Sequence, residues 1–165
     1  MANPAIGIVA GLIGTVPMTA FMEAAHQALP EHEQYPLPPE EVMLSLEHKT
    51  LHEHPDDPAH MVMTWAGHFG YGGAVGTVYA ALVDSLPFSP VVNGALFGLG
   101  GWAASYLGLL PALHILTPAT DHPARRNAVM IAAHLVWGAT TALAVERLED
   151  DDGFEASSPY WQTRY

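Results

Sequence analysis

The sequence contains no cysteine and few basic residues. Its 165 residues include five Lys and Arg against seventeen Asp and Glu. The missing cysteine excludes disulfides, thiolate metal ligands and thiol catalysis. The formal net charge of −12 argues against nucleic acid as a partner, because nucleic-acid-binding surfaces are basic.

Charged residues are absent from long parts of the chain. No Asp, Glu, Lys or Arg occurs in the ranges 1–22, 59–83, 85–120 and 128–145. A helix needs about 20 mainly apolar residues to cross a hydrocarbon layer of roughly 30 Å, and each range is about that long or longer. The sequence therefore predicts an all-α integral membrane protein, a four-helix bundle with spans at about 5–29, 59–83, 91–116 and 127–147.

Two polar segments complete the predicted organisation. Residues 1–148 form one four-span domain that carries a polar insert rich in His and Glu at 30–58, and residues 149–165 form an acidic and aromatic tail. Within the insert we expect a short helix from Pro39 to His52, since proline and glutamates suit a first helical turn.

Four spans place both termini on one side of the membrane, here called side A. The insert and the loop that holds Arg125 and Arg126 then share the opposite side B. This arrangement predicts a multi-pass membrane protein, with the lipid bilayer as its first partner.

The apolar segments contain a repeat. Residues 26–30 read HQALP and residues 114–118 read HILTP, while residues 68–72 read HFGYG and residues 134–138 read HLVWG. The chain thus reads as two tandem helix pairs, which predicts a pseudo-twofold axis along the membrane normal.

The repeat predicts a group of ionisable side chains in the membrane half nearer side B. At 1.5 Å rise per residue, the histidines of the second and fourth spans lie roughly 12 Å below the side B surface. An ionisable residue within a span usually faces the bundle interior and finds a partner there. The predicted metal ligands are Glu23, His26, His68, His114 and His134, and the predicted cofactor-binding pair is His68 and His134.

The side-chain types indicate which ligands this group would take. Met18, Met22 and His26 share one helix face, and thioether with imidazole suits Cu(I). Paired imidazoles from two helices could instead hold a haem iron. Copper and haem are therefore the candidate cofactors. The plain alternative is that the histidines are hydrogen-bonding partners between helices and the methionines are apolar filler.

The insert offers a separate candidate site. His48 and His52 have the i, i+4 spacing of paired ligands on a helix, and His54 and His60 follow. Zinc, copper or nickel would suit these donors. The alternative is a solvated polar loop.

The pattern argues against an enzyme. The chain has neither a Gly-rich phosphate loop followed by Lys nor a nucleophile elbow. Three functions stay open: a metal- or haem-handling accessory component, a purely structural small subunit of a larger membrane complex or homo-oligomer, and a proton or ion pathway.

Several motifs resemble those of the YagU-like group of small, uncharacterised bacterial inner-membrane proteins. They are HFGYG at 68–72, GALFG at 94–98 followed by Trp102, Leu110-Pro111, and HLVWG at 134–138. The resemblance covers about two-thirds of the chain and implies an inner-membrane location. In the third span, where family members often have a histidine after the tryptophan, this chain has Ala103 to Tyr106.

Overall fold

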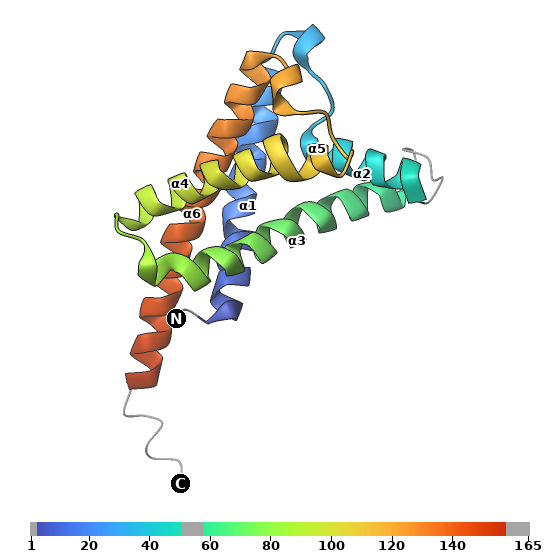
Figure 1. Ribbon diagram of the computed structural model, residues 1–165. Coiled ribbons are helices and arrows are strands. Elements are labelled where there is room, and N and C mark those ends of the chain that lie inside the picture. The colour runs from blue at the N-terminus through green and yellow to red at the C-terminus, as the bar shows by residue number, and fades with distance from the viewer. Residues whose placement is uncertain (1–2, 51–57, 158–165) are drawn as a thin grey trace.

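The structure, a computed structural model, describes residues 3–50 and 58–157, and in these ranges it consists of helices and connecting loops (Figure 1). The long helices are α1 (Pro4–Gln27), α3 (Pro58–Leu82), α4 (Pro90–Ala103) and α6 (Ala124–Ser157). The prediction of an all-helical chain is confirmed. The first two predicted spans agree with α1 and α3 to within two residues at each end.

Shorter elements connect the long helices. They are η1 (Glu31–Glu33), α2 (Pro38–Thr50), η2 (Val83–Ser85), η3 (Ala104–Leu109), α5 (Leu110–Ala112) and η4 (Ala119–Asp121). The short helix expected in the insert corresponds to α2. The end of that prediction at His52 lies outside the described residues.

The third predicted span, 91–116, is less regular than expected. After α4 the chain widens into one π-helical stretch, η3, and the helix ends with α5. Pro111 lies in this region, and proline both lacks a donor N–H and crowds the carbonyl of the preceding turn. A wider turn relieves that crowding. The predicted continuation to residue 116 is therefore wrong by about a turn.

The last helix is longer than predicted. We expected it to end near residue 147 and a tail to follow, but α6 continues to Ser157. The rest of the predicted tail lies outside the described residues.

Helices α1 and α3 pack closely through glycines. A Cβ placed on Gly11 would collide with the carbonyl oxygen of Gly72, and one on Gly76 would collide with the carbonyl oxygen of Gly7. Only residues without a side chain allow such an approach, which is the usual device of membrane helix pairs.

Helices α4 and α6 pack in the same way. A Cβ on Gly94 would meet the carbonyl oxygen of Gly138, and one on Gly98 would meet the carbonyl oxygen of His134. The third close contact joins α1 to α6, where a Cβ on Gly14 would meet the Thr141 hydroxyl. Figure 1 shows α1 and α6 together in the middle of the molecule, with α3 and α4 running obliquely across them in this view.

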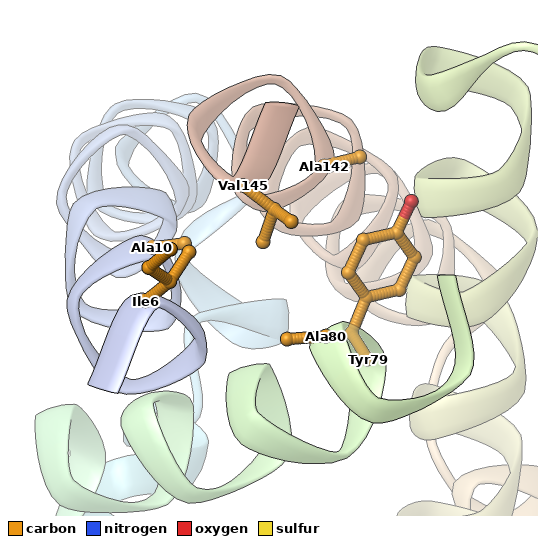
Figure 2. Close-up of a cluster of buried hydrophobic side chains, with 6 residues drawn as sticks. All are labelled: Ile6, Ala10, Tyr79, Ala80, Ala142 and Val145. Atoms are coloured by element: carbon orange, nitrogen blue, oxygen red, sulfur yellow. The ribbon is translucent and has the colours of Figure 1, made fainter. Parts of the chain in front are cut away.

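Two groups of buried apolar side chains form the core. Figure 2 shows the first, in which side chains of α1, α3 and α6 meet: Ile6, Ala10, Tyr79, Ala80, Ala142 and Val145. The second lies nearer the C-terminal end of α1 and consists of Met18, Met22, Met130, Ala133 and Trp137.

Among the residues that the structure describes, three helical stretches are long and apolar enough to cross a membrane: Pro4–Gln27, Pro90–Ala112 and Ala124–Asp150. They indicate a membrane protein with apolar helices in contact with lipid. Helix α3 has the length but is not among them, because His60, His68 and five glycines lower its mean hydropathy.

Candidate functional site

A cavity of about 320 Å³ lies between the helices at the end of the bundle that carries α2. Helices α1, α2, α3 and α6 and the α4–η3–α5 segment all contribute to its wall, which is mostly apolar. The prominent polar side chains are His68 on α3 and His134 on α6, with Tyr106 and Ser105 from η3. The cavity therefore contains the two histidines that occupy matching positions in the sequence repeat.

His68 is held by a chain of two hydrogen bonds that runs through Thr19 of α1. The Thr19 hydroxyl donates to the carbonyl oxygen of Thr15 at 2.8 Å, and the Nε2 atom of His68 lies 3.0 Å from the Thr19 oxygen. Because that hydroxyl has already donated its proton, His68 Nε2–H is the donor in this second bond. Because Nε2 carries the proton, the free lone pair of the neutral His68 ring is on Nδ1.

His134 is held by its own helix. Its Nδ1 lies 2.8 Å from the carbonyl oxygen of Met130, which can only accept, so Nδ1–H donates. The lone pair of His134 is therefore on Nε2. Histidines that bind metals commonly have this arrangement, in which one nitrogen is fixed by an oxygen acceptor and the other is left to coordinate.

Aromatic rings surround the two histidines. The Tyr106 ring meets His134 edge to face with 5.7 Å between centroids, and Trp65 meets His68 at 6.4 Å. Across the cavity the hydroxyls of Tyr71 and Ser105 lie 2.9 Å apart and connect α3 to η3. The hydrogen bonds and ring contacts of His68 and His134 set the orientation of the two imidazoles. Neither Thr19 nor Ser105 was predicted as a site residue.

Methionines contribute soft donors to the same cavity. Met18 and Met22 line it from α1, and Met43 lines it from α2. Met130 is buried beside Met18 and Met22. Met61, which precedes His68 by seven residues, is 62% exposed instead.

The other predicted ligands do not join this cavity. Glu23 is exposed, and it borders a second hollow together with Glu40 and His60. The buried line of α1 runs through Met18 and Met22, and at 3.6 residues per turn Glu23 points away from it. The expectation that Glu23 faces the interior therefore does not hold in this structure.

His26 and His114 also lie elsewhere. Nε2 of His26 donates to the carbonyl oxygen of Tyr35 at 2.7 Å, at the exposed end of α1. His114 follows the end of α5, is exposed, and has a left-handed backbone with φ of 54°. The predicted five-residue convergence thus reduces to His68 and His134. Within residues 3–50 and 58–157, no three His, Asp or Glu side chains are grouped closely enough to hold a metal ion.

The histidine-rich insert also differs from expectation. His48 is exposed, while His60 is buried and its Nδ1 lies 2.7 Å from the Glu47 carboxylate. His52 and His54 lie outside the described residues. This Glu47–His60 pair joins α2 to α3. His60 was predicted as a donor of the insert, but its pairing with Glu47 was not predicted.

Fold and site together define a helical membrane protein with a mostly apolar cavity that is lined by two histidines. The chain belongs to the family described as "Protein of unknown function (DUF1440)", whose family model matches residues 20–143. The matched region includes both cavity histidines. No curated protein and no solved structure matches the chain.

Proposed function

We propose that this chain is a multi-pass protein of the inner membrane with four spans in two tandem helix pairs. The parallel between the two pairs supports the proposal. Gly72 and Gly138, which correspond in the sequence repeat, each turn a carbonyl oxygen toward a glycine of the paired helix, Gly11 or Gly94. The resemblance to the YagU-like group agrees with this location. In this arrangement α3 crosses the membrane against α1, with its histidines facing inward.

We further propose that the protein is an accessory component that holds a transition metal, carried by haem or bound as Cu(I), between His68 and His134. The observation that carries the proposal is the pair of fixed imidazoles. Each donates one N–H to an oxygen acceptor, and the lone pairs on His68 Nδ1 and His134 Nε2 are left over. Two imidazoles from different helices are the axial ligands of many haem proteins.

The size and lining of the cavity bear on the form of the metal. About 320 Å³ is far more than a single ion needs and falls at the small end of cofactor sites, roughly 300–1,000 Å³. The apolar wall suits the body of a haem. Copper would instead recruit a thioether of Met18 or Met22, which line the same wall.

The test is the optical spectrum and metal content of protein purified in mild detergent from cells supplied with copper and a haem precursor. A Soret band identifies haem, and copper without that band identifies the ion. Failure to bind either, even after incubation of the purified protein with haem and with Cu(I), overturns the metal proposal. Colourless protein that co-purifies with fixed membrane partners would favour a structural subunit. Proton flux that depends on Glu23 would favour a pathway.

A further inference from the structure

Helix α2 covers the side B part of the cavity. Its residues Pro38, Val42 and Met43 line the cavity, and the side chains of Pro38 and Met43 are buried there. Figure 1 shows α2 between the start of α3 and α5. In the proposed four-span arrangement the insert lies on side B, so that α2 separates the cavity from the water on that side.

Two buried polar contacts hold α2 in place, one to each neighbouring helix. Glu41 accepts from the Arg126 guanidinium on α6 at 2.6 Å, and only 4% of Arg126 is exposed. Glu47 meets His60 on α3 at 2.7 Å, with exposed fractions of 2% and 7%. The ring of Tyr35 lies 5.6 Å from the Arg126 guanidinium carbon. Thus α2 is attached by polar contacts to α3 and α6 in addition to its apolar ones, whereas the long helices meet through glycine backbones.

Two buried polar atoms near the contact between α2 and α3 have no hydrogen-bond partner. The Oε1 atom of Glu47 is buried without a hydrogen-bond partner, and so is the hydroxyl of Thr64, one turn after His60. A buried polar atom without a partner costs free energy, and a buried ion pair roughly offsets its own desolvation. The polar contacts that hold α2 over the cavity therefore give little net free energy beyond what their burial costs.

We propose that α2 is a gate, and that its release from Arg126 and His60 opens the cavity to ligands from side B. The proposal rests on the proposed function insofar as the cavity receives a ligand. The Glu41–Arg126 and Glu47–His60 pairs act as its two latches. Ligand access then depends on residues that do not touch the ligand.

Cysteine accessibility tests the gate without any metal or haem. The chain has no native cysteine, so Gly101→Cys provides a single thiol in the cavity wall, at a position where a Cβ meets no atom within 4 Å. The variant is placed in nanodiscs and labelled with a charged methanethiosulfonate, which enters from water and not through lipid. Slow labelling is expected with α2 latched.

Glu41→Gln and Glu47→Gln each release one latch and keep the shape of the side chain. In the Gly101→Cys background we expect each to raise the labelling rate by roughly tenfold, a factor that corresponds to about 1.4 kcal/mol. The matched control is Glu40→Gln on an exposed position of α2, which should leave the rate unchanged. Monodisperse gel filtration and unchanged helical circular dichroism establish that each variant is folded.

Equal labelling rates in the parent and both latch variants would overturn the gate, whether those rates are fast or slow. That result would leave the metal proposal standing, because labelling involves neither haem nor copper. Conversely, a protein that binds no metal can still show gated labelling. The gate proposal and the metal proposal can therefore each be rejected without rejecting the other.

Discussion

At the residue scale, the glycines of the long helices fall into two groups. Some lie against the backbone of a neighbouring helix, as Gly138 does against Gly94. Others, such as Gly100, have nothing within 4 Å of where a Cβ would be. The first group sets the distance between helices, and the second does not.

Gly138→Ala should destabilise the protein, because its new methyl group would collide with the carbonyl of Gly94 and force α4 away from α6. Overpacking of this kind costs roughly 1–3 kcal/mol. Gly100→Ala is the matched control and should be neutral or slightly stabilising, since alanine favours helix. Thermal unfolding in detergent compares the two variants. An unfolding temperature of Gly138→Ala equal to that of the parent would contradict the close glycine contact.

At the element scale, two adjacent arginines at the start of α6 differ in their burial and in the groups they bind. Arg126 is buried and binds both Glu41 and the carbonyl oxygen of Pro36, which fastens the insert to α6. Arg125 has a 68% exposed side chain and lies 3.8 Å from Glu33. Neighbouring residues of the same type thus differ in what their loss should cost.

Arg126→Ala should lower stability by roughly 3 kcal/mol, because it leaves the Glu41 carboxylate without its partner in a mostly buried place. Arg125→Ala should cost roughly 0–1 kcal/mol, as expected for an exposed ion pair. Unfolding in detergent measures both. If the two substitutions have equal effects, the insert is not fastened through Arg126.

The start of α4 depends on one buried amide. The Asn93 side chain accepts from the N–H of Phe88 and donates to its carbonyl oxygen, at 3.1 and 2.7 Å. Asn93→Ala should therefore destabilise by roughly 1–3 kcal/mol, the cost of leaving backbone groups without partners. Asn3→Ala, at an exposed cap of α1, should cost less. Similar unfolding temperatures for the two variants would argue against the role of Asn93.

At the scale of the whole molecule, the sequence predicts helix positions better than side-chain directions. Charge-free stretches reveal spans because membrane thickness dictates their length. The rise per residue likewise gives the depth of a side chain. It does not give its direction around the helix axis. Glu23 was placed inside only by the general tendency of ionisable residues within spans, and the structure leaves it exposed. The predicted position of His114 is wrong for another reason, because the helix that was expected to carry it ends with α5.

The polar contacts of the site also could not be predicted from the sequence. The hydrogen bond between His68 and Thr19 joins residues of two different helices, and so does the contact of Glu47 with His60. No local pattern brings such residues together. Matching histidines in the two halves nevertheless pointed to His68 and His134, because both follow the same spacing to a packed glycine.

The four-span arrangement makes a prediction about sidedness. Single cysteines at Asn3 and Arg147 should be labelled by an impermeant maleimide from one side, and cysteines at His48 and Thr120 from the other. All four positions are exposed, and the chain supplies no competing thiol. If α3 does not cross the membrane, the thiols at positions 48 and 120 will instead be labelled from opposite sides.

The most direct test of the central claim is the amount of haem or copper bound per chain after reconstitution of matched variants. Parent protein and His114→Asn should bind alike, since His114 lies outside the cavity and asparagine tolerates its left-handed backbone. His68→Ala and His134→Ala should each lose most of the bound metal while the chain stays folded. Undiminished binding in both cavity variants, or loss of binding in His114→Asn alone, would contradict the account.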